Sequence, residues 1–134
     1  MDLFYQTKGW TDIIDITNDI NRLIENKKIL KGLVNVFVKG STAAITTIEA
    51  DDNLFEDFKN ILNNIIPMDR DWLHHQTWGD DNGGSHLRAS LIGQDVNIPV
   101  RNGNLVLGTW QKIVLIDFDT SPRKREVIIT LVSG

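Results

Sequence analysis

The amino-acid sequence predicts a fold of β-strands with two helices inserted among them. Two segments carry apolar residues at intervals of three and four, as amphipathic helices do, and the segments around them are rich in β-branched residues, which favour strands. The chain has 134 residues, of which 41% are hydrophobic and 24% charged, as in an ordinary globular domain. We therefore expect a single domain over residues 1–134.

The first elements are two short strands, expected at 3–7 and 11–15 and joined by a turn at Gly9. A helix follows, for which Thr17 or Asn18 can supply the N-terminal cap. Its apolar face consists of Ile16, Ile20, Leu23 and Ile24. Positive charge at residues 26–28 ends this helix, where the helix dipole favours it.

Two strands and the second helix come next. The strands are predicted at 32–38 and 42–48, partnered through a tight turn at Gly40. The helix has the clearest apolar stripe of the chain, made of Leu54, Phe55, Phe58, Ile61, Leu62 and Ile65. A side chain among residues 51–53 can accept hydrogen bonds from its free N–H groups, and Pro67 ends it.

The segment 67–85 differs from the rest because it lacks periodicity and holds two Trp, two His and four Asp. A loop of that length in a small domain is usually functional, so we expect a functional loop here, followed by a helical turn at 86–92. Strands are then predicted at 96–100, 105–117 and 126–132. Asn102-Gly103 predicts a hairpin, and residues 119–125 a charged turn.

Composition excludes several classes of function. The net charge of -4, from 14 Lys and Arg against 18 Asp and Glu, disfavours a protein that wraps duplex nucleic acid. Without cysteine there are no disulfides, thiolate metal sites or Cys nucleophiles. We also find no signal peptide and no apolar run near the roughly 20 residues that cross a bilayer, so we expect a cytoplasmic protein without membrane contacts.

The first polar cluster is Lys39-Gly40-Ser41-Thr42, followed by Glu49 and Asp51-Asp52. Glycine lets the backbone approach a ligand closely, and the hydroxyls with nearby N–H groups can hold an anion such as phosphate. The alternative is an ordinary hairpin turn in which Ser and Thr bond their own backbone.

The second polar cluster holds all three histidines of the chain. Its members are His74, His75, Asp80, Asp81, Asn82 and His86. Imidazole and carboxylate groups bind divalent metals such as zinc and also serve as acids and bases. The alternative is a solvated polar loop, because the spacing matches no sharp metal motif.

The third cluster is Gly108-Thr109-Trp110-Gln111, inside a predicted strand, where glycine indicates a bulge or a close approach of two backbones. Trp110 is either a core residue or a platform for a flat ligand. The run Arg123-Lys124-Arg125 is either a solvated turn or an anion contact. Three of the four tryptophans lie in the two segments that also hold the histidines and the Gly-Thr-Trp-Gln motif, namely Trp72, Trp78 and Trp110, and only Trp10 stands apart.

Three segments together resemble the YjbQ-like family, also called the secondary thiamine-phosphate synthase enzyme family. They are Gly40 to Thr47, Asp81 to Ser90, and Gly103 to Gln111 with its Leu-Gly-Thr-Trp-Gln ending. The resemblance extends over nearly the whole chain, including the Arg-x-Arg-x-Val pattern at 123–127.

The resemblance implies a compact α+β fold, in which mixed or antiparallel strands form a β-sandwich-like core with two or three helices packed outside. It also implies a homotrimer and a weak thiamine-phosphate synthase activity, which joins hydroxymethylpyrimidine diphosphate to thiazole phosphate and releases pyrophosphate. A divalent metal, zinc or magnesium, would stabilise the leaving group. The alternatives are a non-catalytic trimer that binds a small ligand or a metal, and a purely structural trimer.

The resemblance also suggests roles for individual residues. His74 and His86 are the expected metal ligands, and Glu49, Asp80, Asp81 and His86 the expected catalytic groups. The expected substrate-binding residues are Gly40, Ser41, Thr42, Asn82, Ser85, Thr109, Trp110 and Gln111. Many family members carry histidine where this chain has Gly84, and some where it has Gly79, so a third histidine ligand would have to be replaced by His75 or a carboxylate.

Overall fold

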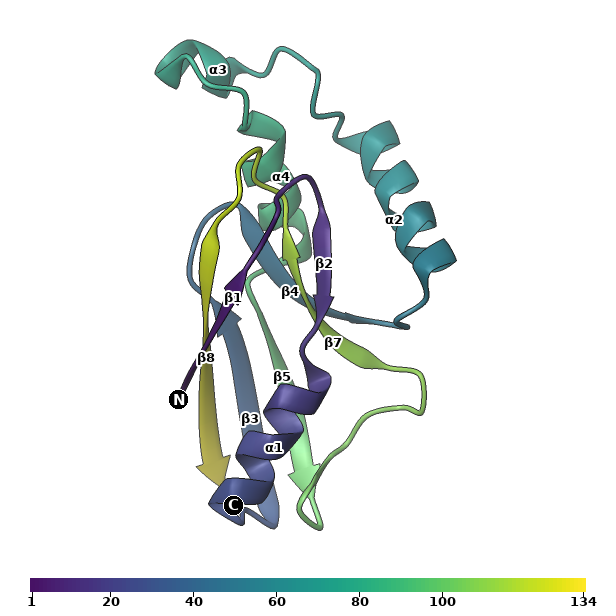
Figure 1. The fold of residues 1–134 in the computed structure, drawn as a ribbon, viewed down its shortest axis with the longest axis vertical. Helices are drawn as coiled ribbons and strands as arrows, with labels where there is room; N and C mark the ends of the chain where they lie inside the picture. Colours follow the sequence, from purple (N-terminus) through teal and green to yellow (C-terminus); the bar gives the residue numbers. More distant parts are fainter.

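A computed structural model describes residues 1–134 and contains eight strands in two sheets, with four helices around them (Figure 1). The five-stranded sheet has the order β1 (Asp2–Gln6), β8 (Lys124–Ser133), β3 (Lys31–Val38), β5 (Asp95–Arg101) and β6 (Asn104–Leu105). The three-stranded sheet has the order β2 (Asp12–Asp15), β7 (Lys112–Asp117) and β4 (Ala43–Ile48). All neighbouring strands are antiparallel.

The main core lies between the two sheets and is made of β-branched and leucine side chains. Val36 of β3 and Ile129 of β8 belong to the same buried cluster as Ile45 of β4 and Leu115 of β7. Helix α1 (Thr17–Lys27) adds Ile20 and Ile24 to this cluster. The predicted α+β fold with a sandwich-like core is therefore confirmed.

The helix caps follow the predictions in part. Helix α2 (Asp52–Ile65) is capped by Asp51, whose carboxylate accepts a hydrogen bond from the Leu54 N–H at 2.9 Å, as expected. Helix α1 is capped from outside, because the Asp15 carboxylate accepts from both the N–H and the hydroxyl of Thr17. The predicted cap by the Thr17 or Asn18 side chain is wrong.

The predicted hairpin of strands 32–38 and 42–48 is also wrong. Strand β3 belongs to the five-stranded sheet and β4 to the three-stranded sheet, so residues 39–42 carry the chain from one sheet to the other. Likewise, the predicted strand 105–117 is two strands, β6 and β7, separated by a loop at 106–111. The Asn102-Gly103 hairpin is confirmed, with Arg101 paired to Asn104 and both turn residues at positive φ.

The segment 67–85 is not one long loop. It contains helix α3 (Leu73–Trp78) and the start of helix α4 (Gly83–Ile92), which covers the three-stranded sheet (Figure 1). The first turn of α4 is Gly83-Gly84-Ser85, and all three residues are buried. Small residues pack closely without forming an apolar stripe, so the periodicity that signals a helix is missing here. None of the four helices is long and apolar enough to cross a membrane.

Candidate functional site

A polar depression of about 270 Å³ lies where the 39–42 connection, the start of α4 and the connection between β7 and β8 meet. No hydrophobic residue lines it. Its lining residues are Gly40, Ser41, Thr42, Asn82, His86, Asp119, Arg123 and Arg125. We call it the His86 pocket. Five of the predicted site residues therefore come together in one place.

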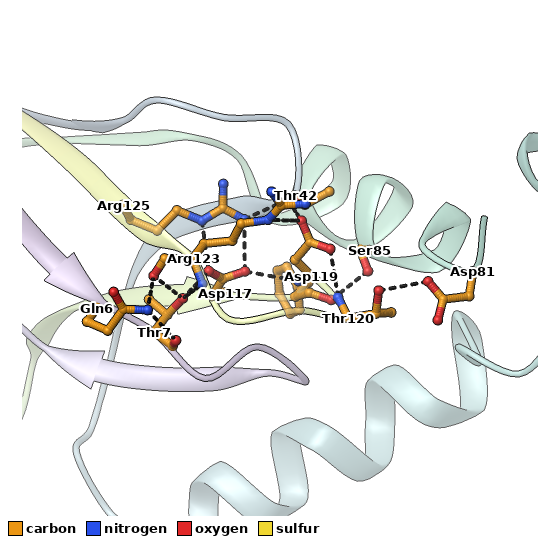
Figure 2. Close-up of polar contacts among 11 residues, drawn as sticks. Gln6, Thr7, Thr42, Asp81, Ser85, Asp117, Asp119, Thr120, Arg123 and Arg125 are labelled. Carbon is orange, nitrogen blue, oxygen red and sulfur yellow. Dashed lines mark hydrogen bonds and ion pairs between the residues drawn. The ribbon is translucent and has the colours of Figure 1, made fainter. Parts of the chain in front are cut away.

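A buried network of charged groups forms one wall of the pocket (Figure 2). Arg125 binds Asp117 through two hydrogen bonds, Nε to Oδ2 at 2.7 Å and Nη2 to Oδ1 at 2.9 Å. The same Nη2 donates to the Thr42 hydroxyl at 2.6 Å, and that hydroxyl donates to Asp119 at 2.9 Å. Thr7, on the chain just after β1, also donates to Asp117. The network ties four segments together and fixes the pocket wall.

Gly40 is required by this network. Its φ is +132°, and a Cβ at this position would lie 2.6 Å from Nη1 of Arg125. Any side chain would collide with the guanidinium or push it away from Asp117. The glycine thus allows the backbone to pass closely over the arginine.

Some polar groups in the pocket have no partner within the chain. Arg123 uses only its Nε, which donates to Asp119 at 3.0 Å, and its side chain is half exposed. The backbone N–H groups of Gly40 and Ser41 have no acceptor in the chain. The Asn82 Oδ1 atom is buried and makes no hydrogen bond. Because buried polar atoms are nearly always paired, this pocket can offer both donors and an acceptor to a ligand.

His86 stands beside His74 at the edge of the pocket. Their ring centroids are 4.6 Å apart, and His74 Nδ1 lies 3.0 Å from the Asp80 carboxylate. Burial and the neighbouring His74 lower the pKa of His86, and they outweigh Asp119, Asp80 and the Ser41 backbone, which raise it. His86 is therefore a neutral imidazole at pH 7, able to donate and accept hydrogen bonds.

Asp119 keeps its negative charge despite its burial. Burial raises its pKa, but the hydrogen bonds from Thr42 and Thr120 and the nearby Arg123 together lower the pKa by more, so the net shift is downward. The two carboxylates of the wall, Asp117 and Asp119, thus offset the charges of Arg123 and Arg125. The pocket is close to neutral overall while keeping directed donors.

An apolar cleft of about 330 Å³ continues from the polar pocket on the other side of His86. It is lined by Trp72, Leu73, His74, Gly83, His86 and Leu87. His86 is common to both cavities, so a ligand with an anionic end and a flat apolar end can occupy them together.

The residues present do not fit a tightly bound metal. No three His, Asp or Glu side chains are arranged around a common point, although His74 and His86 are adjacent. His75 is turned away, since its Nε2 accepts from the Gly83 N–H at 3.0 Å. A structural or catalytic zinc site needs at least three protein ligands, and this cluster brings together fewer.

The surroundings of Gly84 leave little room for a histidine in place of the glycine. A Cβ there would lie 2.9 Å from the sulfur of Met68 and 3.3 Å from the indole nitrogen of Trp72. A histidine ring at this position would displace both residues. At Gly79 the space is open, but φ is +67°, which favours glycine.

The other predicted site residues are not in the pocket. Glu49 directly follows β4, whereas Thr42 directly precedes it, so strand geometry separates them by roughly 20 Å. Gln111 donates to Thr47 at 3.1 Å, which places Thr109, Trp110 and Gln111 at the Glu49 end of β4. Trp110 is 71% exposed, so the core interpretation of this residue is wrong.

Asp81 and Ser85 support the pocket from outside. Asp81 accepts a hydrogen bond from the Thr120 hydroxyl at 2.7 Å. Ser85 is fully buried and donates to the Phe118 carbonyl, so it holds α4 against β7 and does not line the cavity. Figure 2 shows both residues on the α4 side of the network.

Asp117, Asp119 and Arg125 are functional-site residues that sequence reasoning missed or underrated. The solvated-turn interpretation is wrong for Arg125, whose side chain is only 9% exposed. The available signal was the run Arg123-Lys124-Arg125 just before a predicted strand, since residues two apart along a strand lie on the same face; the structure has β8 begin at Lys124. Nothing in the local sequence indicated the partner carboxylates.

The comparisons with known proteins agree on one family. The model of the family described as "UPF0047 protein YjbQ-like" matches residues 2–134. A UPF0047 protein from Archaeoglobus fulgidus is 36% identical over 129 residues, covering 96% of this chain and 98% of that protein. Another, from Methanothermobacter thermautotrophicus, is 36% identical over 126 residues, which cover 94% of this chain and 86% of that protein.

Solved structures agree with this result. A YbjQ-like protein of unknown function from Sulfolobus solfataricus superimposes with a TM-score of 0.93 at 32% identity, covering 100% of this chain and 96% of that one. A protein of the YjbQ/UPF0047 family from Clostridium acetobutylicum gives a TM-score of 0.89 at 32% identity, covering 98% of this chain and 99% of that one.

Proposed function

Because the chain belongs to the UPF0047 YjbQ-like family, we propose that its His86 pocket binds a small phosphorylated molecule and supports a weak thiamine-phosphate synthase reaction. The observation that carries the proposal is the set of unpartnered groups in the pocket. Arg123 and the N–H groups of Gly40 and Ser41 are donors suited to phosphate oxygens. Asn82 Oδ1 is an acceptor suited to an amino group.

The reaction joins the exocyclic methylene carbon of hydroxymethylpyrimidine diphosphate to the ring nitrogen of thiazole phosphate. A C–N bond forms, the C–O bond to the diphosphate breaks, and pyrophosphate leaves with the electron pair. The thiazole nitrogen has no proton to lose, so the protein's main task is to stabilise charge on the leaving group. Arg123 is the residue best placed for that task, since its two Nη groups are unpaired at the pocket.

The apolar cleft beside His86 supports a flat ring next to the phosphate group. Trp72 and Leu87 offer apolar surface there, and the neutral His86 ring lies between cleft and pocket.

Three further expectations stay predictions: a bound divalent cation, a homotrimer and a cytoplasmic location. The first is tested by comparing the metal content of the purified wild-type protein with that of His86→Ala.

The test compares Arg123→Gln with Lys124→Gln, which removes the neighbouring charge next to Phe4 instead. We expect Arg123→Gln to slow pyrophosphate release by about 10- to 100-fold, and Lys124→Gln to leave the rate unchanged. Equal rates for wild type and Arg123→Gln would refute the role of this pocket.

A non-catalytic binding protein is the second candidate, because Asp117 and Asp119 already offset the two arginines of the pocket wall. A near-neutral pocket stabilises a departing pyrophosphate only weakly. This alternative predicts saturable binding of thiazole phosphate that Arg123→Gln weakens, with no turnover. Rescue of a thiamine-requiring strain at normal expression supports the enzyme, and rescue only on overproduction supports the binder.

A further inference from the structure

The largest cavity of the molecule, about 480 Å³, lies outside the His86 pocket. Its walls come from the turn between β1 and β2, the C-terminal half of α2 with the segment that follows it, and α4. Its lining residues are Trp10, Thr11, Lys59, Asn63, Pro67, Met68, Asp69 and Arg88. We call it the Arg88 cavity. Its volume is in the range of small-molecule sites, roughly 300–1,000 Å³.

Arg88 is the unusual residue of this cavity. It is only 2% exposed and has no carboxylate partner. Its Nε and Nη2 donate to the Ile66 carbonyl at 3.0 and 2.8 Å, and Nη2 also donates to Asn63 at 2.9 Å. Nη1 donates to Thr11 at 3.0 Å, which leaves its second N–H without an acceptor.

These hydrogen bonds have a structural role, because they join the end of α2 to α4 and to the β1–β2 turn. They do not neutralise the guanidinium. The carbonyl end of a helix such as α2 is equivalent to only about half a negative charge. A buried cation without a carboxylate is costly, so Arg88 favours an anion in the adjacent cavity.

The backbone of the β1–β2 turn is strained, and it holds the Trp10 side chain at the cavity. Trp10 and Thr11 have φ of 55° and 64°, a left-handed conformation that residues other than glycine rarely adopt. The Trp10 side chain lines the cavity and is 59% exposed. A large aromatic surface is thereby held at the mouth of the cavity, where a flat ring can stack on it.

The charges of the lining residues indicate what charge the ligand should carry. Lys59 and Arg88 are positive and Asp69 is negative, so the lining carries a net charge of one. Glu56, 3.4 Å from Lys59, is an exposed partner that solvent largely screens. This balance suits a monoanion better than a phosphate dianion. We propose that the Arg88 cavity binds a small aromatic monocarboxylate, with its carboxylate at Nη1 of Arg88 and its ring against Trp10.

The two sites lie on different faces of α4. His86 and Arg88 are two residues apart, which turns their side chains by roughly 200° around the helix. Neither cavity shares a lining residue with the other. The proposal is therefore independent of the function assigned to the His86 pocket.

Benzoate is the probe for the test. We expect saturable binding with a dissociation constant on the order of 1 mM, seen as a shift of the Thr11 backbone amide signal in NMR spectra at constant ionic strength, a signal that every variant below retains. Trp10→Ala and Lys59→Met each weaken binding by about 3- to 10-fold, and Asp69→Asn strengthens it by about 2- to 5-fold. Trp110→Ala and Lys27→Met are the matched controls and leave it unchanged.

Several outcomes would overturn the proposal. These are no saturation up to roughly 50 mM, equal effects of Trp10→Ala and Trp110→Ala, or inorganic phosphate binding the cavity more tightly than benzoate. Arg88 itself is left intact because its loss would unfold the end of α2. The Arg123→Gln variant retains benzoate binding, so failure of the His86 pocket assignment and failure of this one are distinguishable.

Discussion

At the residue scale, the ion pair of Arg125 with Asp117 is the interaction on which the pocket wall depends most. Both side chains are nearly fully buried, and Arg125 also contacts Thr42. Arg125→Met leaves Asp117 buried without a cation, so we expect unfolding in urea to show a loss of about 3–5 kcal/mol. Arg22→Met removes the exposed pair with Asp19 and should cost at most about 0.5 kcal/mol. Similar losses in both variants would contradict the importance of the network.

His86 makes the stability of the protein depend on pH. Its folded-state pKa lies below the unfolded value of about 6.5, because of burial and of His74, with Asp119 and Asp80 acting in the opposite direction. The unfolded chain therefore binds more protons as the pH falls below 6.5, and stability decreases until the folded-state pKa is passed. We expect the melting temperature of wild type to fall more between pH 7.5 and 5.5 than that of His86→Gln. Parallel curves would contradict the shift.

The buried residues of the pocket wall show a limit of sequence reasoning. The segment 119–125 contains mainly charged and small polar residues, which usually means a solvated turn. Arg125 is buried because Thr42 and Asp117, from other parts of the fold, accept its hydrogen bonds. Thr7 in turn donates to Asp117. Such pairing depends on the register of two sheets, and no local pattern encodes it.

At the scale of elements, α2 depends strongly on its cap. Only Leu62 of this helix is buried, so tertiary packing holds it weakly. Asp51→Ala removes the acceptor for the Leu54 N–H and should cost about 1 kcal/mol, with faster hydrogen exchange in the first turn of α2. Asp52→Ala removes an acidic side chain of the same turn that has no capping bond and serves as the control. Equal exchange in the two variants would show that the cap is unimportant.

Elements with strong local signals were predictable, and those formed by tertiary packing were not. The apolar stripe of α2 and the Asn102-Gly103 turn each carry their signal within a few residues. Helix α4 begins with Gly83-Gly84-Ser85, which pack against Met68 and Trp72, so its helicity comes from contacts with residues outside the helix. Loop 106–111 interrupts the expected strand at Gly108, where glycine did mark an irregularity.

At the scale of the whole molecule, the chain's passage between sheets determines which predicted residues meet. Residues 39–42 leave β3 and enter β4, which brings Thr42 next to Asp119 and His86. The polar clusters could be recognised in the sequence. Which end of β4 each cluster lies at depends on the sheet to which each strand belongs, and the sequence did not show that. Consequently Gly40, Asn82 and His86 form one pocket, while Glu49 and Trp110 lie at the opposite end.

The exposed apolar surface bears on the predicted trimer. Ile61 and Ile65 of α2 and Leu91 of α4 are each more than half exposed. Extended apolar surface marks an interface, whereas single exposed apolar side chains are ordinary. We predict that these side chains are covered in the homotrimer implied by the family resemblance. We expect light scattering to give the mass of three chains. Since association stabilises the folded state by mass action, the melting temperature should also rise with protein concentration. A single-chain mass with a concentration-independent melting temperature would contradict the trimer and leave these side chains as ordinary exposed residues.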